Sequence, residues 1–272
     1  MKVELASDSM MVIASWNVNS VRMRLGALRR FMRKYQPDVL CLQEIKVRDE
    51  LFPLDTLRRL GFTAIAVHGQ KGYHGVAIAS RRPFADRSTY VLGRCRDARH
   101  LAVRFDNGLT VHNMYVPAGG PDPDPEKNPR FADKLRFLRA TARWMKAWPT
   151  GERAVLAGDL NVAPLEHDVW SHEKLRRVIT HTPIEIDHLA RAQRAHAWVD
   201  VAREVVPPER KLYTWWSYRA PDWQRVDKGR RLDHIWVSPT LRSNIADFRV
   251  AKEVRGWSQP SDHAPILAYL TL

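Results

Sequence analysis

Short apolar runs recur along the chain, and polar turns separate them, as is typical of buried β-strands. Each run has five to eight residues, and most runs are rich in β-branched or aromatic side chains and bounded by Gly, Pro, Asp or Asn. We expect strands at 11–15, 38–43, 62–67, 75–80, 100–105, 109–116, 153–159, 232–238 and 265–270.

Apolar residues spaced by three and four positions predict helices between some of these strands. The spacing is clear in 21–35, where arginines occupy the opposite face, and in 131–148, and it is weaker in 184–206. Strands outnumber helices and do not alternate strictly with them. This order favours two packed sheets with helices outside over a purely parallel sheet.

The chain is strongly basic, with 44 Lys and Arg against 30 Asp and Glu and a formal net charge of +14. Such a surplus indicates a polyanionic partner, either nucleic acid or an anionic membrane surface, and solubility alone is the alternative. Basic residues gather in 22–34 and 219–231. Aromatic residues that can stack on bases or sugars, or simply pack, lie in or beside the second segment: Trp215, Trp216, Tyr218 and Trp223.

The remaining composition limits the class of protein. A hydrophobic fraction of 44% excludes wholesale disorder, and no apolar run reaches the roughly 20 residues of a membrane span. Cys41 and Cys95 are too few for a disulfide framework, so we expect both to be reduced in a cytoplasmic protein. We expect residues 1–10 to form a flexible extension and 11–272 a single domain, with a Pro-rich surface loop at 116–129.

Polar side chains follow the first two predicted strands. Asn17 and Asn19 share one side of the first strand, where amides can bind a phosphate or a metal, although a simple turn is the alternative. Glu44 leaves a buried strand, where a carboxylate is costly unless it is paired or bound to a metal. Lys46 lies on the same side, so a structural salt bridge explains Glu44 equally well.

Further polar residues lie at the ends of later strands. Asp159 and Asn161 share a side, with an Asx turn as the alternative, and Asp233 begins the strand at 232–238. Asp262 and His263 precede the last strand, where a capped turn is the alternative. Taken together, oxygen ligands of this kind suit Mg²⁺ or Mn²⁺ rather than zinc. A divalent ion, a histidine and amide donors around a phosphate make a site for phosphodiester hydrolysis.

Eight motifs, in order and at matching spacing, resemble the bacterial exonuclease III family of the endonuclease/exonuclease/phosphatase superfamily. The resemblance runs from about Met11 to Leu272. It implies a DNase I-like α/β fold, a four-layer sandwich of two mixed β-sheets packed face to face with helices outside. The motifs are SWNVNSVR, LCLQEIK, GQKGYHGVAI, MYVPAGG, LAGDLNVAP, YTWWSYR, RRLDHIWVS and PSDHAPI.

The resemblance also implies an activity, a metal and a partner. The activity is that of a DNA-repair nuclease, which cleaves 5′ to abasic sites, removes nucleotides in the 3′→5′ direction and removes 3′ blocking groups. The cofactor is one or two Mg²⁺ ions, for which Mn²⁺ can substitute. The partner is double-stranded DNA with abasic sites or 3′ ends, bound by a monomer with no membrane association. A phosphoesterase for lipids or small phosphates, and a catalytically dead DNA-binding relative, are the alternatives.

Roles carry over by resemblance onto the matching residues of this chain. Glu44 is implied as the main metal ligand, with Asn17 and Asp262 nearby, and Asp159 and Asn161 as ligands of a second ion. Asp159 is also implied to align or deprotonate the attacking water, and Asn161 to donate to the phosphate oxygens. The implied catalytic set is completed by His263 at the scissile phosphate, Asp233 holding its imidazole, and Tyr115.

Seven residues are implied to contact DNA, and two positions depart from the family pattern. The DNA-binding residues are Asn19, Lys46, Lys71, Tyr73, Trp215, Arg219 and Leu232. Ala118 stands where some relatives have an amide side chain, so one phosphate contact is lost or supplied from elsewhere. Arg230 stands where the human apurinic endonuclease has an aromatic pocket wall, which leaves open the balance between abasic-site cleavage and exonuclease activity.

Overall fold

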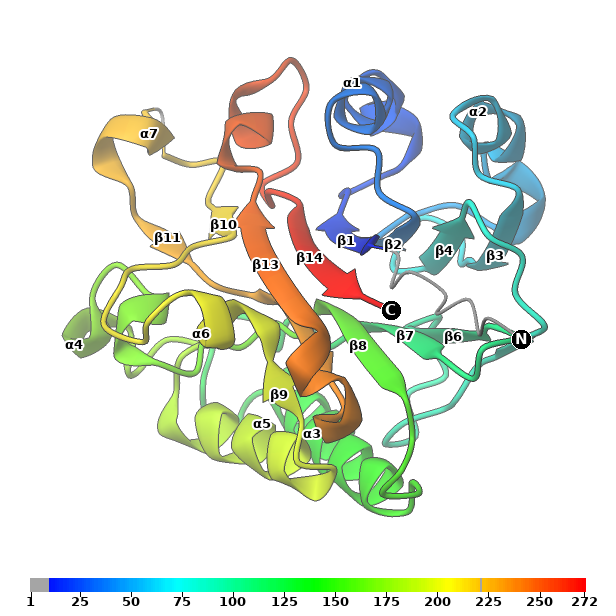
Figure 1. The fold of residues 1–272 in the computed structure, drawn as a ribbon. Helices are drawn as coiled ribbons and strands as arrows, with labels where there is room; N and C mark the ends of the chain where they lie inside the picture. The colour runs from blue at the N-terminus through cyan, green and yellow to red at the C-terminus, as the bar shows by residue number, and fades with distance from the viewer. Residues whose placement is uncertain (1–9, 221) are drawn as a thin grey trace.

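Two six-stranded mixed sheets lie face to face, and helices cover their outer faces (Figure 1). The computed structural model describes residues 10–220 and 222–272. The four-layer α/β sandwich expected from the sequence is therefore confirmed. Most of the expected extension, residues 1–9, lies outside the described residues, and Met10 is already the first residue of strand β1.

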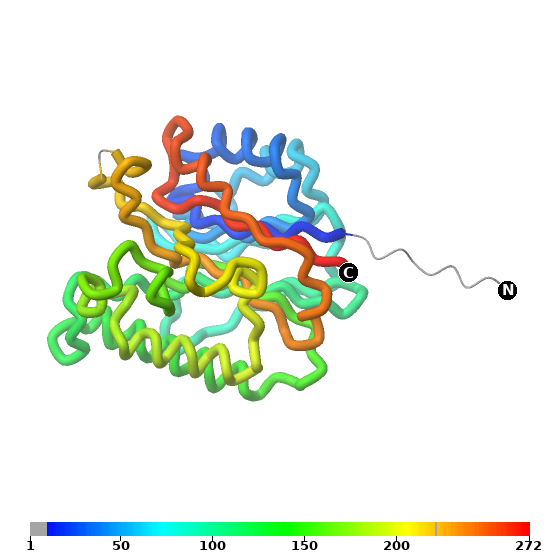
Figure 2. The backbone as a smooth tube through the Cα atoms, turned by 60° about the vertical axis from the view of Figure 1, so that its left-hand side comes forward, coloured from blue at the N-terminus to red at the C-terminus, as the bar shows by residue number. Residues whose placement is uncertain are grey.

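The first sheet has the strand order β13-β14-β1-β2-β4-β3. Its central strand β1 runs antiparallel to β14 and parallel to β2. Figure 2 shows β1 and β14 side by side, so the first and last strands of the described chain belong to one sheet. The strands are β1 (Met10–Asn17), β2 (Val39–Gln43), β3 (Ala64–His68), β4 (Val76–Ser80), β13 (Ile245–Val250) and β14 (Ile266–Thr271).

The second sheet has the strand order β5-β6-β7-β8-β12-β9. Strand β8 is parallel to β7 and antiparallel to β12, and the register places Asp159 opposite Asp233. The strands are β5 (Asp86–Ser88), β6 (His100–Arg104), β7 (Thr110–Tyr115), β8 (Ala154–Asp159), β9 (Val199–Asp200) and β12 (Asp233–Val237). A separate two-stranded ribbon pairs β10 (Trp215–Trp216) with β11 (Gly229–Arg230).

Helices α1 and α2 cover the first sheet, and the longer helices α3 and α5 cover the second (Figure 1). Helix α3 begins where the sequence favours it, because Asn128 accepts a hydrogen bond from the Arg130 N–H and Pro129 occupies the first turn. The helices are α1 (Leu25–Tyr35), α2 (Leu54–Arg59), α3 (Pro129–Lys146), α4 (His172–Leu175), α5 (Pro183–Ala195), α6 (Val201–Val205) and α7 (Trp223–Val226). Short 3₁₀ turns are η1 (Arg22–Arg24), η2 (Asp49–Leu51), η3 (Glu166–Asp168), η4 (Pro239–Asn244) and η5 (Lys252–Gly256).

The single helix expected over 184–206 is wrong. Helix α5 ends at Ala195, and the chain turns at Ala197, whose φ of +51° belongs to the left-handed region that stops a helix. Strand β9 and the short helix α6 follow. The apolar spacing continues across this turn because both pieces pack inward, so the pattern alone does not reveal the break.

The inward faces of the two sheets form one apolar core. Residues from the first sheet, such as Ile13 and Ile78, meet residues from the second, such as Val111 and Ile235, and all four are fully buried. Among the described residues, no helix combines the length and the apolar character that crossing a membrane requires.

A buried amide pair ties the two sheets together at the end of β2. Gln43 Nε2 donates to Asn113 Oδ1 over 2.8 Å, and Asn113 Nδ2 donates to the backbone oxygens of Leu42 and Ala77, each over 2.9 Å. Buried amides are costly unless they are hydrogen-bonded, so these bonds fix how the sheets face each other. The next residue after Gln43 is Glu44, and the pair therefore anchors the strand that delivers this carboxylate.

Candidate active site

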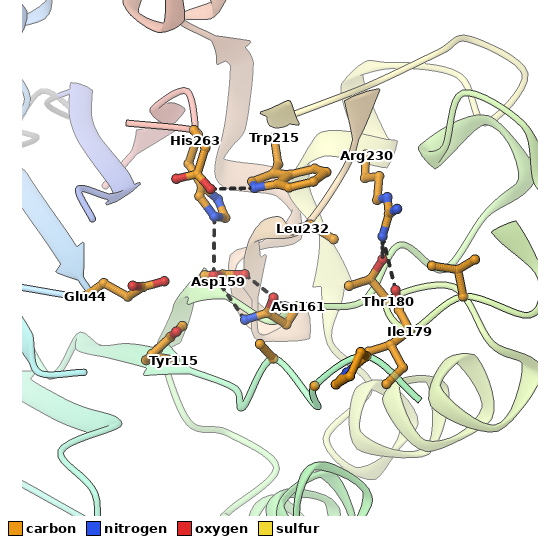
Figure 3. Close-up of a pocket in the computed structure, with 15 residues that line it drawn as sticks. Glu44, Tyr115, Asp159, Asn161, Ile179, Thr180, Trp215, Arg230, Leu232 and His263 are labelled. Atoms are coloured by element: carbon orange, nitrogen blue, oxygen red, sulfur yellow. Dashed lines mark hydrogen bonds and ion pairs between the residues drawn. The ribbon is translucent and has the colours of Figure 1, made fainter. Parts of the chain in front are cut away.

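A cavity of about 330 Å³ opens where strands from both sheets end (Figure 3). Side chains that lie far apart in the sequence line it together. They include six of the residues expected in the catalytic or metal-binding set, namely Glu44, Tyr115, Asp159, Asn161, Asp262 and His263, together with Trp215, Leu232 and Arg230. Asn17, Asn19, Lys46 and Asp233 are not part of the lining but bond to residues that are.

Asn17 links the two sheets at the cavity. It is the last residue of β1, and its Nδ2 donates to Glu44 Oε1 over 2.8 Å and to Asp159 Oδ2 over 2.9 Å. Its Oδ1 accepts the Asn19 N–H, which closes the turn that the sequence offered as an alternative. Asn17 thus presents a donor, rather than an oxygen ligand, to the two carboxylates.

Glu44 turns into the cavity because the chain leaves β2 in a left-handed conformation, with φ of +49°. Such a backbone is unfavourable for a non-glycine residue and is found mostly where function or packing requires it. Lys46 Nζ lies 3.0 Å from Glu44 Oε2, so the alternative salt bridge is also present. Burial acts to raise the pKa of Glu44, but the Asn17 bond and the Lys46 charge outweigh it and lower that pKa.

Asp159 and Asn161 stand at the end of β8. Gly158 permits this arrangement, because a Cβ at that position would lie 1.9 Å from the Met114 carbonyl oxygen of the neighbouring strand. The Asn161 N–H donates to Asp159 Oδ1 over 3.0 Å, an Asx turn, and Asn161 Nδ2 donates to Asp159 Oδ2 over 3.1 Å. Asn161 Nδ2 also donates to the carbonyl of Val116 over 2.9 Å. The backbone N–H and the side-chain amide of Asn161 thus both donate to the Asp159 carboxylate.

His263 lies between two carboxylates. Its Nδ1 is 2.8 Å from Asp233 Oδ2, and its Nε2 is 3.7 Å from Asp159 Oδ2. Burial alone would lower the pKa of His263, but the charges of Asp233 and Asp159 outweigh burial and raise it. Burial raises the pKa of Asp159, against the opposing charge of His263. His263 Nε2 therefore lies at ion-pair distance from Asp159, beyond the length of a hydrogen bond, and both groups face the cavity.

Tyr115 is the last residue of β7 and lines the cavity, and its ring packs against the guanidinium of Arg99. The Arg99 guanidinium lies 4.8 Å from the centroid of the Tyr115 ring, and the His74 ring lies 5.9 Å from it. Burial raises the pKa of Tyr115 well above its ordinary value, and nearby Glu44 and Asp159 raise it further. The phenol therefore stays protonated and can donate a hydrogen bond.

The far wall of the cavity consists of Trp215, Leu232 and Arg230 (Figure 3). Trp215 Nε1 donates to Asp262 Oδ2 over 2.9 Å, and Asn19 Nδ2 donates to Asp262 Oδ1 over 3.1 Å. Arg230 donates to Thr180 Oγ1 over 2.8 Å. This wall is therefore aromatic and cationic. Ala118 also lines the cavity and offers no side-chain donor.

Besides Asn19 and Lys46, three residues expected to bind DNA lie outside the lining of this cavity. Lys71 and Tyr73 belong to the loop 69–75, in which residues 71–73 are exposed, and 70% of Tyr73 is accessible to solvent. Arg219 is also exposed and lines a neighbouring cavity instead. These positions leave all three side chains free to meet a polymer that extends beyond the cavity.

The oxygen atoms that line the cavity are ligands that fit a hard divalent cation. Glu44 and Asp159 carboxylates accept bonds from a single Asn17 nitrogen, and such closely placed acids repel each other unless a positive charge lies between them. Ligand atoms of Asp159, Asp233 and His263 also lie within 4.8 Å of one another. His263 Nδ1 is already bonded to Asp233, however, so the carboxylate oxygens of Glu44, Asp159 and Asp262 are the more available ligands.

Sequence reasoning missed three residues that support this site. Thr214 Oγ1 donates to Asp233 Oδ2 over 2.6 Å, and Ser261 Oγ donates to the Asn17 carbonyl over 2.6 Å. Lys134, fully buried on α3, donates to the Asn161 carbonyl over 2.7 Å. Thr214 lies within the YTWWSYR motif, but Lys134 carries no local signal because an isolated lysine on a helix is ordinarily solvated.

Comparison with known proteins places this geometry in a family. Residues 14–263 match the model of the Endonuclease/Exonuclease/phosphatase family. The chain is 32% identical to exodeoxyribonuclease III of Haemophilus influenzae, over 95% of this chain and 99% of that one. An AP endonuclease from Archaeoglobus fulgidus superposes with a TM-score of 0.89 at 30% identity, over 96% of this chain and 100% of that one.

A second solved structure agrees. The 3′-5′ exonuclease NExo from Neisseria meningitidis superposes with a TM-score of 0.88 at 34% identity, again over 96% of this chain and 100% of that one. The family match covers most of the chain, and the matched segment contains every side chain that lines the cavity. The chain therefore belongs to the Endonuclease/Exonuclease/phosphatase family, in its exodeoxyribonuclease III branch.

Proposed function

We propose that this protein is a DNA-repair nuclease that hydrolyses phosphodiester bonds in duplex DNA. It cuts on the 5′ side of abasic sites and removes nucleotides or blocking groups from 3′ ends. The observation that carries this proposal is the meeting of Glu44, Asp159 and His263 in one cavity, from three separate parts of the chain. The relatives named above act on DNA by name, and the net charge of +14 suits a phosphate polymer.

We infer that the cofactor is Mg²⁺, replaceable by Mn²⁺, bound as one or two ions. Glu44 and Asp262 would hold the first ion, and Asp159 with Asn161 a second where one binds. Asn17 helps by fixing two of these carboxylates rather than by offering its own oxygen. When bound, the ion offsets negative charge on the phosphate and on the leaving oxygen.

The chain's own residues then act on the phosphate and the attacking water. Asp159 accepts a hydrogen bond from that water and directs it at phosphorus. Tyr115 donates to a phosphate oxygen, whose charge grows as the bond to the nucleophile forms, and Asn161 Nδ2 donates to the phosphate in exchange for its bond to Asp159. His263, kept protonated by Asp233 at its other nitrogen, donates from Nε2 to the phosphate.

The DNA strand would run along the exposed basic side chains beyond the cavity. Lys71 and Tyr73 would meet the backbone. Asn19, which follows β1, and Lys46, which follows β2, contact Asp262 and Glu44 and would approach the phosphate from there. Trp215, Leu232 and Arg219 would contact the reacting nucleotide and its neighbour. We infer that residues 11–272 work as one domain, as a monomer and in the cytoplasm.

A single incubation tests the proposal. The substrate is a duplex with one abasic-site analogue and a recessed 3′ end, supplied with Mg²⁺ or with EDTA. We expect Mg²⁺ to give both a cut 5′ to the analogue and a ladder from the 3′ end, and EDTA to abolish both. An intact duplex in Mg²⁺, with hydrolysis of a phospholipid or a small phosphate ester instead, would overturn the assignment.

A further inference from the structure

Two residues that line the catalytic cavity have a left-handed backbone although neither is glycine. Asn161 has a φ of +53° and Thr180 a φ of +90°, and both border the cavity (Figure 3). Such a backbone is unfavourable for a residue with a Cβ, and most of all for a β-branched one such as threonine. Strained residues keep this conformation only where their surroundings hold them in it. The contacts that hold Asn161 and Thr180 therefore set the shape of the cavity.

A buried lysine holds the chain on the Asn161 side. Lys134 of α3 has no exposed side-chain surface, and its Nζ donates to the Asn161 carbonyl over 2.7 Å and to the Ala118 carbonyl over 3.4 Å. The same Nζ forms an ion pair with Glu185 of α5. An ammonium group has three N–H donors, so these three partners satisfy all of them. Two of the three partners are backbone oxygens of residues that line the cavity.

The partner carboxylate holds the Thr180 side. Glu185 accepts the Thr180 N–H, which lies 3.0 Å from each of its oxygens, the Thr182 N–H over 3.1 Å and the Thr182 hydroxyl over 2.6 Å. The bonds to Thr182 form the capping box that starts α5, and a capping box needs neither Thr180 nor a lysine. The bond to Thr180 is additional. It fixes the residue whose hydroxyl accepts a hydrogen bond from Arg230 over 2.8 Å.

Stability alone explains this ion pair poorly. Both side chains are fully buried. Taking two charges out of water costs free energy, and well-packed neutral side chains often replace such a pair without loss of stability. Helices α3 and α5 pack against each other outside the second sheet (Figure 1), so rigid elements carry the two charges. An ion pair on this support can fix two loop residues at a defined separation.

We propose that Lys134 and Glu185 are positioning residues, whose ion pair holds Asn161 and Thr180 at the separation that aims the Asn161 amide at the phosphate. The inference rests on the proposed function, which assigns this amide to the phosphate. The lysine acts through the Asn161 carbonyl, because fixing the peptide group that follows a residue restricts the direction of its side chain. Neither Lys134 nor Glu185 lines the cavity, so neither touches the substrate.

A double substitution tests this role without leaving a buried charge unpaired. Lys134→Met with Glu185→Gln removes both charges and keeps an oxygen that can accept the Thr180 N–H. Cleavage of the abasic duplex in Mg²⁺ under single-turnover conditions gives the rate constant of hydrolysis and the apparent affinity. We expect the rate constant to fall at least ~10-fold and the affinity to change less than ~3-fold, because a displaced donor is lost mainly from the transition state. An unchanged rate constant would overturn the inference.

The same double substitution in an Asn161→Ala background distinguishes positioning from a general structural effect. Without the amide the ion pair has nothing to aim, so we expect a further loss of less than ~3-fold. An equal loss in both backgrounds would contradict the inference. Thermal unfolding shows whether each variant is folded at the assay temperature, and Lys134→Leu with Glu185→Gln repeats the test with another apolar side chain.

The matched control removes an ion pair that joins two other elements. Arg242→Met with Glu204→Gln deletes an exposed pair of 3.0 Å between η4 and α6. Neither residue lines the cavity. We expect the rate constant of this control to equal that of the wild type. A loss in the control as large as that in the Lys134 variant would show that removing any such pair slows hydrolysis, and would overturn the inference.

A measurement without cleavage reports on the same contact. NMR of protein labelled with ¹⁵N-asparagine follows hydrogen exchange of the Asn161 side-chain amide, whose signal is assigned by its absence in Asn161→Ala. We expect exchange at least ~10-fold faster in the double variant, but unchanged at Asn113, which is fully buried between the sheets. Unchanged exchange at Asn161, or an equal increase at Asn113, would overturn the inference. If the wild type leaves the duplex intact, the proposed function fails, and exchange alone decides whether the ion pair holds the amide.

Discussion

Asp233 Oδ2 lies 2.8 Å from His263 Nδ1, although 30 residues separate the two in the chain. Trp215 of β10 forms an isolated β-bridge with His263, and Asp233 is the first residue of β12. This pairing brings the two side chains together. Thr214 Oγ1 donates a hydrogen bond to the same oxygen of Asp233. The imidazole is therefore oriented before any substrate arrives, and its Nε2 is directed towards Asp159.

Asp233→Asn should separate the contribution of Asp233, which orients His263, from the contribution of the imidazole itself. The amide cannot stabilise a protonated His263, so we expect turnover of the abasic duplex to fall by ~100-fold or more. His263→Ala should cost a similar factor, and the double variant should be little worse than His263→Ala alone, because the two residues act as a unit. Losses that multiply in the double variant would show that they act independently. Unchanged thermal unfolding would establish that each variant is folded.

Asp159→Ala removes the carboxylate that receives donors from both sheets. We expect turnover to fall by at least ~100-fold, because an oriented water contributes on that scale. Duplex affinity, measured in EDTA, should change little or increase, since a negative charge leaves a site that accepts phosphate. Near-normal turnover in this variant would refute the role assigned to Asp159.

Glu44→Gln tests the cation site directly. We expect the Mg²⁺ concentration that gives half-maximal activity to rise by at least ~10-fold, because the amide keeps the shape but loses the charge. Glu50→Gln is the matched control, since Glu50 is exposed and lies 3.9 Å from Arg48 in a surface pair. An identical Mg²⁺ dependence in the wild type and the Glu44 variant would exclude Glu44 as the main ligand.

The sequence predicted where the polar side chains of the cavity stand, but not how they bond to one another. Strand ends carry Asn17, Glu44 and Asp159 as expected, because apolar runs mark buried strands and the polar residue after each run marks its end. The turn at Asn17, the salt bridge of Glu44 and the Asx turn at Asp159 are all present as well. Local turn chemistry and catalytic placement are thus not exclusive, since the turns aim the side chains.

Other features depend on tertiary contacts that no local pattern encodes. Strand β13 has only one buried residue in six, Phe248, so its apolar signal is weak. The ion pair of Lys134 and Glu185, buried between α3 and α5, lies 51 residues apart and reads as two ordinary surface charges on helices. Burying such charges is favourable only once both helices are packed, which sequence spacing does not reveal.

Asp168→Asn should show a stability effect that depends on pH. Asp168 is fully buried, accepts two bonds from Arg231 over 2.8 and 2.9 Å, and also pairs with Arg203. Removing its charge leaves Arg203 without this acid and leaves the buried Arg231 with Asp200 alone, at 2.7 Å, so we expect the free energy of unfolding at pH 7 to fall by roughly 3 kcal/mol. Urea denaturation followed by circular dichroism measures this change.

The pH dependence follows from the sign of the shift. Burial acts to raise the pKa of Asp168, but the two arginines outweigh it and lower the folded-state pKa below the ordinary 3.8. The stabilisation is therefore complete above about pH 4 and is lost as the pH falls through the lowered pKa. Wild type and variant should converge only in that acid range. Asp55→Asn, which removes an exposed pair with Arg58 at 3.3 Å, should change stability by less than ~0.5 kcal/mol at pH 7. A constant difference between wild type and Asp168→Asn down to pH 2 would contradict the ion-pair account.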